Sequence, residues 1–328
     1  MSTIAGTENG AWTRDTLSRN QWLVPLPAEC WNELETAVHE TAGRQTPVHE
    51  LSAEHFSLTQ CRVFASNLRR QYLDAGPKFA VVDRLPVERF SKDELTRAYW
   101  LLASLVSRPV QQTYGGTMLF HVRDEGVGSQ MKPGSGIRAT ITNLDLNFHN
   151  DNCFNTVMPD YVGLLCLRAA RTGGLSKAVS FHTLHELLAQ ENPDLLERLY
   201  EPIWWDRHRE FGPDELPYVA NPVFEDDEQG RPLARYSTYN IRGGYKLREE
   251  ALDDRLELAM AKLAELFSQA DLQSNFMMEP GQIQFVNNRS IGHARTDFVD
   301  DAVDPDHKRH LVRLWLRDRG SVQYEGTA

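Results

Sequence analysis

Three side chains in this sequence, His149, Asp151 and His293, have the types and spacing of a metal site. His149 and Asp151 lie two residues apart at the end of an expected β-strand, and alternate residues of a strand point to the same face. One imidazole and one carboxylate on one face supply two of the three protein ligands of a 2-His-1-carboxylate iron site. Taken alone, a His-x-Asp pair is more often a chance occurrence, so this interpretation depends on a third ligand.

The candidate for the third ligand is His293. It follows an expected strand at 282–287 and stands beside Gly292, which lets the backbone approach closely. The completed set would leave three coordination positions open, which suits ferrous iron that must bind a co-substrate and oxygen. The alternative is a histidine in a surface loop, and spacing alone does not decide between the two.

Two arginines follow on the last expected strand. Arg309 and Arg313 are four residues apart and therefore on one face of that strand, where guanidinium groups could hold a dicarboxylate bidentately. The hydroxyl of Ser176, which follows a Gly-Gly turn, could supply another donor to that carboxylate. The alternative is a pair of solvated arginines.

Periodicity and turn signals indicate the elements that must position these residues. Helical periodicity covers 28–40, 58–73, 91–105, 182–191, 193–200 and 248–266. Ser91 and Glu94 form a capping-box sequence. Strand patterns cover 78–83, 161–168, 176–181, 276–278, 282–287 and 309–317. The stretch 110–120 also looks extended, with Gly115-Gly116 as a bend or bulge. Residues 202–247 are aromatic, charged and proline-rich, and the length and irregularity of this stretch predict an inserted lid.

These patterns predict an α+β, mainly β, fold, in which a β-sandwich or jelly roll is decorated with helices. The strands do not alternate regularly with helices, so a parallel βαβ sheet is the weaker interpretation. We expect a single domain over 1–328, with a helix-rich part at 1–108 and a β core at 109–328.

Composition argues against several classes of protein. The chain has 328 residues, 41% of them hydrophobic and 25% charged, as in ordinary globular proteins. A net charge of -11 without a basic stripe argues against a nucleic-acid or membrane partner, and no apolar run approaches the roughly 18 residues of a membrane span. Residues 1–13 lack the pattern of a signal peptide, and the four cysteines are widely spaced. We expect a reduced, cytoplasmic protein; whether it forms a homo-oligomer stays open.

From about residue 101 to 318 the sequence resembles the taurine-dioxygenase and clavaminate-synthase-like branch of the iron(II)/2-oxoglutarate-dependent oxygenases. The resemblance rests on the order and spacing of six segments. They are Phe-His-Asn-Asp at 148–151, Val-Gly-Leu-Leu-Cys-Leu-Arg at 162–168, Gly-Gly-Leu-Ser at 173–176, Pro-Gly-Gln-Ile-Gln-Phe-Val-Asn-Asn at 280–288, His-Ala-Arg-Thr-Asp-Phe at 293–298 and Arg-His-Leu-Val-Arg-Leu-Trp-Leu at 309–316.

The resemblance implies a double-stranded β-helix (jelly-roll, cupin-like) core with flanking helices, and an enzyme that uses iron(II), 2-oxoglutarate and O2. The implied iron ligands are His149, Asp151 and His293. Arg309 would pair with the distal carboxylate of 2-oxoglutarate with support from Ser176, and Arg313 would lie near the co-substrate. The implied reaction hydroxylates an unactivated C–H bond while 2-oxoglutarate becomes succinate and CO2. Because Asp151 is a carboxylate, hydroxylation is favoured over halogenation.

We expect the prime substrate to be a small polar metabolite. Asp145 and Asn147 share the strand face of His149, so Asp145 could hold an amine while Arg313 holds a carboxylate or phosphonate. This arrangement fits an amino-acid-like or zwitterionic substrate from natural product biosynthesis or catabolism. The alternative for Asp145 is a pair with a nearby arginine. Two further candidates for the pocket wall are Gln112 and Phe154.

Two other interpretations stay open. The same cofactor chemistry could desaturate, epoxidise or cyclise a biosynthetic intermediate, either free or bound to a carrier. A different class is a non-catalytic jelly-roll protein that binds a metal or small molecule through a vestigial site. A complete set of ligands together with an arginine for the co-substrate argues against such decay.

Overall fold

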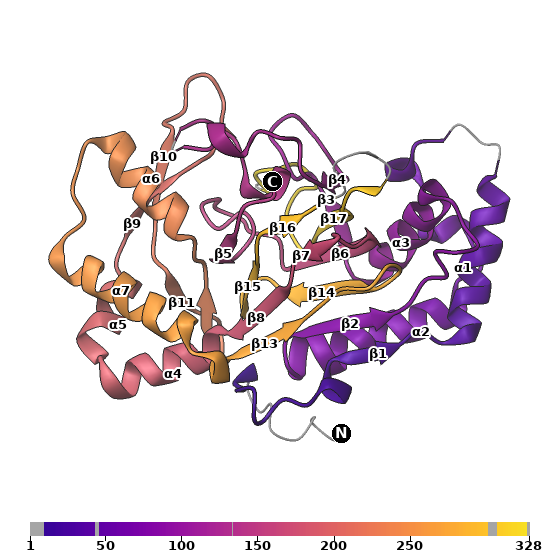
Figure 1. Cartoon of the computed structure of the whole chain (residues 1–328), viewed down its shortest axis with the longest axis horizontal. Helices are drawn as coiled ribbons and strands as arrows, with labels where there is room; N and C mark the ends of the chain where they lie inside the picture. The colour runs from indigo at the N-terminus through magenta and orange to yellow at the C-terminus, as the bar shows by residue number, and fades with distance from the viewer. Residues whose placement is uncertain (1–9, 43–45, 133, 301–306, 327–328) are drawn as a thin grey trace.

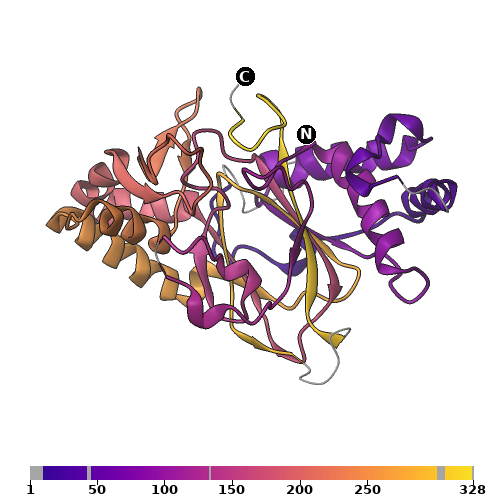
Figure 2. The same ribbon diagram turned by 90° about the horizontal axis from the view of Figure 1, so that it is seen from above.

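The computed structural model describes residues 10–42, 46–132, 134–300 and 307–326 as two central sheets between two groups of helices (Figures 1 and 2). The larger sheet has seven strands in the order β1-β2-β14-β6-β17-β3, with β4 also beside β17. Its strands are β1 (Leu23–Pro25), β2 (Phe79–Asp83), β3 (Arg108–Val110), β4 (Phe120–Val122), β6 (Tyr161–Arg168), β14 (Ile283–Asn287) and β17 (His310–Arg317). Apart from the parallel pair β1–β2, its neighbours are antiparallel.

The smaller sheet carries the strands of the predicted metal site. Its order is β13-β8-β15-β5, with every pair antiparallel. The strands are β5 (Leu146–His149), β8 (Ser176–Ser180), β13 (Gln273–Phe276) and β15 (Ile291–Arg295). Three short pairs complete the β structure: β7 (Thr172–Gly173) with β16 (Phe298–Val299), β9 (Ile203–Asp206) with β10 (Tyr218–Asn221), and β11 (Phe224–Asp226) with β12 (Pro232–Ala234).

The helices form two separate groups. The first consists of α1 (Ala28–Thr41), α2 (Thr59–Leu68) and α3 (Lys92–Val106). The second consists of α4 (Phe181–Glu191), α5 (Pro193–Tyr200), α6 (Thr238–Arg248) and α7 (Asp254–Ser268). Figure 2 shows them on opposite sides of the sheets. Within the described ranges, no helix combines the length and apolar character needed to cross a membrane.

Alternation along the larger sheet divides the core in two. Val82 and Leu314 point toward α1–α3 and join the outer apolar cluster. Val81 and Trp315, each one residue along the same strands, point the other way and pack in the inner cluster with Ile291 of the smaller sheet. Successive side chains of a strand point to opposite faces, and here both sets are apolar and buried, so the sheet is covered on both faces. The metal site lies on the inner side.

Most elements expected from the sequence are present. The strand at 161–168 has the expected bounds, and α3 begins after an N-cap Ser91 in a capping box with Glu94. The expected helix at 58–73 ends as an α-helix at Leu68 and continues as a π-helix, Arg69–Ala75. The stretch at 110–120 has the expected bend at Gly115-Gly116: β3 and β4 are separated by a turn in which Gly116 has a φ of +89°.

The expected insertion at 202–247 is more regular than its composition indicated. It contains the strands β9–β12 and most of α6. The expected helix at 248–266 starts only at Asp254, because Glu249 has a φ of +57° and ends α6 in the left-handed region. His293 was expected in the loop after the strand at 282–287. It lies instead in the middle of a further strand, β15.

Candidate metal centre and adjoining cavities

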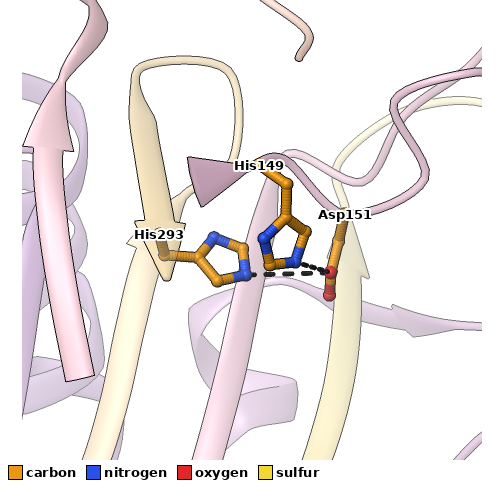
Figure 3. Close-up of side chains that lie close together, drawn as sticks. All are labelled: His149, Asp151 and His293. Carbon is orange, nitrogen blue, oxygen red and sulfur yellow. Dashed lines mark ion pairs between the residues drawn. The ribbon is translucent and has the colours of Figure 1, made fainter. Parts of the chain in front are cut away.

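The three predicted ligands meet at one end of the smaller sheet. His149 closes β5, Asp151 lies in the turn that follows, and His293 lies directly across from His149 on the neighbouring antiparallel strand β15. Figure 3 shows both imidazoles pointing toward the carboxylate. The Nε2 atoms of His149 and His293 lie 3.4 and 3.7 Å from Asp151 Oδ1. One ligand atom from each residue falls within 4.8 Å of the others, which is compact enough for a shared cation.

Two asparagines fix the turn that carries Asp151. The backbone N–H of Asp151 donates to Asn288 Oδ1 (2.9 Å), and Asn288 Nδ2 donates back to the Asp151 carbonyl (2.8 Å). Asn150 Nδ2 donates to the carbonyls of Asn288 (2.7 Å) and Ile291 (3.0 Å). Because Asn288 and Ile291 flank the turn before β15, these bonds tie the β5 end of the site to the strand that holds His293.

The hydrogen bonds around the histidines favour metal binding through Nε2. His149 Nδ1 lies 2.9 Å from the carbonyl of Asn147. A carbonyl can only accept, so Nδ1 carries the proton and Nε2 keeps its lone pair. Nδ1 of His293 is buried and has no hydrogen-bond partner among the described residues. Burial lowers the pKa of His293, and the nearby His149 lowers it further, so its imidazole is neutral at physiological pH.

The second oxygen of Asp151 faces two donors from β17. Oδ2 accepts from Trp315 Nε1 (2.7 Å) and lies 3.1 Å from Arg313 Nη1. Burial alone would raise the pKa of this carboxyl, but Arg313 and the two histidines hold it well below its ordinary value. Gln112, expected on the substrate wall, instead lies behind Arg313: its Oε1 accepts from Arg313 Nε (2.9 Å) and its Nε2 donates to the Arg313 carbonyl (2.8 Å).

A first cavity opens from the triad toward Arg309. Its wall includes all three ligands together with Ser176 of β8 and Arg309, so the predicted co-substrate residues are brought to one place. Arg309 is only 5% exposed, its guanidinium stacks on the Phe298 ring at 5.0 Å, and its Nη1 has no partner among the described residues. Burial lowers the pKa of Arg309 to about 10, so it stays cationic at neutral pH. An unpaired buried cation facing a His-Asp-His cluster fits a dicarboxylate that chelates the metal.

A second cavity opens from the other side of the triad. The predicted substrate residues Asp145, Asn147 and Phe154 line it, and Arg313 lines both cavities. Asp145 Oδ1 accepts from the backbone N–H of Asp297 (2.8 Å). In the part of the chain that the structure describes, Asp145 forms no ion pair with an arginine. The residue is exposed, and its charge also acts on Arg295: burial lowers the pKa of that arginine to about 9, and Asp145 partly offsets the shift.

Several residues that line this second cavity were not predicted from the sequence to belong to a site. His208 and Tyr239, from the insertion, stack with ring centroids 5.3 Å apart, and Phe154 lies 5.9 Å from His208. His208 has a left-handed backbone (φ +51°), which its sequence context does not signal. Trp315 was quoted only as part of a motif. Its place two residues after Arg313 would have put it on the same strand face.

Comparison with known proteins assigns the family. Residues 44–315 match the model for the taurine catabolism dioxygenase TauD, TfdA family. The chain belongs to this family, and the protein is an enzyme, an iron(II)- and 2-oxoglutarate-dependent dioxygenase.

Similar proteins cover nearly the whole chain. FR-33289 synthase from Streptomyces rubellomurinus is 26% identical over 97% of this chain and 92% of its own. An asparagine oxygenase, solved with Fe(II), 3-hydroxyasparagine and succinate, superposes with a TM-score of 0.67 at 19% identity, covering 94% of this chain and 99% of that one. The oxygenase OrfP, solved with Fe, succinate and (3S)-hydroxy-L-Arg, gives a TM-score of 0.60 at 13% identity over 90% and 94%. At these identities the two solved structures establish a shared fold.

Proposed function

We propose that the protein hydroxylates a C–H bond of a small, amino-acid-like metabolite, with iron(II) held by His149, Asp151 and His293. One observation carries the proposal: two different cavities meet at His149 and Asp151, and His293 lines one of them. One ends in the buried cation Arg309, whose Nη1 has no partner within the described ranges, and the other has the acidic Asp145 and the aromatic Phe154 and Tyr239 on its wall. A 2-oxoglutarate-dependent hydroxylase needs this pair of compartments, one for the co-substrate and one for the substrate.

The co-substrate compartment is assigned to 2-oxoglutarate. Arg309 would bind the distal carboxylate as a charge-assisted fork, and the Ser176 hydroxyl would donate to the same group. Arg313 would contribute its second nitrogen, because Nη2 is buried without a partner in the described ranges while Nη1 and Nε are engaged by Asp151 and Gln112. The core that places these residues is proposed to be a double-stranded β-helix, within one domain over 1–328.

When bound, iron(II), 2-oxoglutarate and O2 supply the oxidising power to break an unactivated C–H bond, with succinate and CO2 as co-products. The residues of this chain determine where that power is applied. Three protein ligands leave three positions of an octahedral site open, and retention of the Asp151 carboxylate favours hydroxylation over halide transfer. The insertion at 202–247, which supplies His208 and Tyr239 to the cavity wall, is proposed to act as a lid that excludes water from the substrate.

The substrate class follows from the second cavity. Asp145 would bind the amine of a zwitterion, Asn147 and Phe154 would contact its side chain, and Arg313 lies at the base of the cavity near the metal. Solved relatives hold 3-hydroxyasparagine and (3S)-hydroxy-L-Arg, both hydroxylated amino acids. The similarity to FR-33289 synthase supports a role in natural product biosynthesis.

A substrate panel tests the proposal. Purified protein loaded with iron(II) is incubated with 2-oxoglutarate, O2 and free amino acids or their derivatives, and succinate and product mass are measured. We expect at least one amino-acid-like compound to stimulate succinate formation and to gain one oxygen. Loss of two hydrogens would assign a desaturase or cyclase instead. No stimulation by any zwitterion, combined with turnover of a carrier-bound or purely anionic compound, would contradict the proposed substrate class.

A further inference from the structure

The two oxygens of the Asp151 carboxylate have different environments. Oδ1 faces the imidazole Nε2 atoms of His149 and His293 at 3.4 and 3.7 Å. Oδ2 points to the opposite side, where it accepts from Trp315 Nε1 at 2.7 Å and lies 3.1 Å from Arg313 Nη1. A charged acceptor with two donors at these distances forms strong hydrogen bonds. Oδ2 is therefore occupied by two donors, and Oδ1 is the oxygen left to bind a metal beside the histidines.

Both donors are themselves held in place. Trp315 is 2% exposed, lies on β17 between Val162 of β6 and Val110 of β3, and stacks on the Tyr324 ring with centroids 6.2 Å apart. Tyr324 in turn donates from its hydroxyl to Asn152 Oδ1 (2.9 Å), in the turn next to Asp151. The indole therefore cannot turn away from Oδ2 without disturbing the sheet.

The second donor is anchored by its own neighbours. Arg313 donates from Nε to Gln112 Oε1 (2.9 Å), and its guanidinium lies 5.0 Å from the ring centroids of both Phe120 and Trp315. Gln112 is fully buried and donates to the carbonyls of Met118 (3.0 Å) and Arg313 (2.8 Å). The Oδ2 environment is therefore built from buried groups that are anchored by other parts of the protein.

We propose that Trp315, together with Arg313, is a positioning residue that restricts Asp151 to one metal-binding oxygen and so keeps the O2 position open. The inference rests on the proposed function, in which Asp151 is an iron ligand. The reasoning counts the ligand positions of a six-coordinate metal. Three monodentate ligands leave three of six octahedral positions, and a chelating 2-oxoglutarate takes two of them. If Asp151 bound through both oxygens, the last position would be lost and O2 would have nowhere to bind.

Trp315→Phe tests this inference, because it keeps an aromatic ring in the sheet and removes only the N–H donor and part of the indole. The matched control is Trp100→Phe in α3. Trp100 is also buried, at 3% exposed, and its Nε1 donates to the Leu51 carbonyl (2.9 Å) on the far side of the larger sheet. Both substitutions replace a buried tryptophan by phenylalanine and remove one indole hydrogen bond, so we expect them to lower the stability of the fold by similar amounts.

The readout is taken anaerobically, without turnover. Each protein is loaded with iron(II) and then 2-oxoglutarate, and the charge-transfer absorption is recorded. Nitric oxide, a probe of the O2 position, is then titrated while the high-spin iron–nitrosyl electron paramagnetic resonance signal is followed. For Trp315→Phe we expect the 2-oxoglutarate band to persist and nitric oxide affinity to fall by roughly tenfold, the scale of one lost hydrogen bond to a charged group. Trp100→Phe should match the parent in both measurements.

Nitric oxide binding by Trp315→Phe that equals the parent, with the 2-oxoglutarate band intact, would overturn the inference. If Trp315→Phe does not fold, Gln112→Met releases Arg313 while keeping the indole. It should weaken nitric oxide binding in the same direction, and an unchanged affinity would overturn the inference as well. Failure of the proposed function looks different, because the parent protein would then give no 2-oxoglutarate band at all.

Discussion

Arg309→Met is the substitution whose effect can be worked most fully from the structure. Arg309 is 5% exposed and, within the described ranges, forms no ion pair; its Nη1 has no hydrogen-bond partner. Burial lowers the pKa of its guanidinium only to about 10, so the side chain is a buried cation at pH 7. A carboxylate of 2-oxoglutarate would provide the missing counter-charge, and methionine offers similar length without charge.

The expected magnitude has two parts. Removing one member of a buried, hydrogen-bonded charge pair costs about 2–5 kcal/mol, which corresponds to a dissociation constant for 2-oxoglutarate raised roughly 30-fold to several thousandfold. Without ligand, the same substitution removes a desolvated cation whose guanidinium forms no ion pair within the described ranges. The free energy of unfolding of the unliganded protein should therefore stay the same or rise. Weaker binding without loss of stability is an unusual combination for a buried site.

The assay is an anaerobic titration of the iron(II)-loaded protein, followed by charge-transfer absorption. 2-Oxoglutarate is compared with 2-oxobutyrate, which keeps the chelating oxo-acid and lacks the distal carboxylate. We expect Arg309→Met to lose the preference for 2-oxoglutarate and to bind 2-oxobutyrate as the parent does. Arg309→Lys, which keeps a charge without the fork, should fall between them. Equal 2-oxoglutarate affinity in parent and Arg309→Met, or equal loss of both ligands, would refute the reasoning.

Three further predictions follow from the same geometry. Asp151→Ala should abolish the 2-oxoglutarate charge-transfer band, because it removes the carboxylate that the two histidines face; a retained band would place the iron elsewhere. Asp145→Asn should weaken the binding of an amine-bearing substrate by roughly two- to fivefold, about 0.5–1 kcal/mol for an exposed charge pair, and steady-state kinetics should show that the dependence of rate on 2-oxoglutarate concentration is unchanged. Burial lowers the pKa of His208 to about 4, so protonation near pH 5 favours the unfolded chain, whose histidine titrates near 6.5. This histidine should therefore cost about 2 kcal/mol of stability between pH 7 and 5, and urea unfolding of His208→Gln should show a correspondingly shallower loss.

The sequence predicted that His149, Asp151 and His293 would lie close together, and the structure brings them together. Strand alternation predicted one shared face for His149 and Asp151, but Asp151 lies in the turn after β5, where Asn288 holds it. The elements β6 and α3 are marked by a continuous apolar run and a capping box. β15 was missed because its residues, Ile291–Arg295, include a glycine and an arginine and carry no alternating pattern. It is a strand because β5 and β8 supply hydrogen bonds on both sides, from residues more than a hundred positions away.

The misplacement of Gln112 has a similar cause. A polar residue before a Gly-Gly bend looked like part of a pocket wall, yet its side chain is fully buried and bonded to Arg313, about two hundred positions along the chain. Whether a polar side chain faces a ligand or another side chain depends on which strands become neighbours. That information is absent from a local pattern. The same limit applies to His208, whose place in the cavity depends on the fold of the whole insertion.

Under the proposed function, the last strand lets one short segment contribute to binding of the co-substrate, to the metal site and to the O2 position. Residues on the inner face of β17, or just before it, are Arg309 at the co-substrate cavity, Arg313 shared by both cavities and Trp315 on the Asp151 carboxylate. Intervening residues such as Leu314 are committed to the outer core. The distal wall of the substrate cavity comes from a different part of the chain, the insertion that contributes His208 and Tyr239. Substitutions on β17 should therefore alter co-substrate binding and oxygen use, whereas substitutions in the insertion should alter the choice of substrate. This separation would let the insertion diverge between relatives without disturbing the chemistry at the metal.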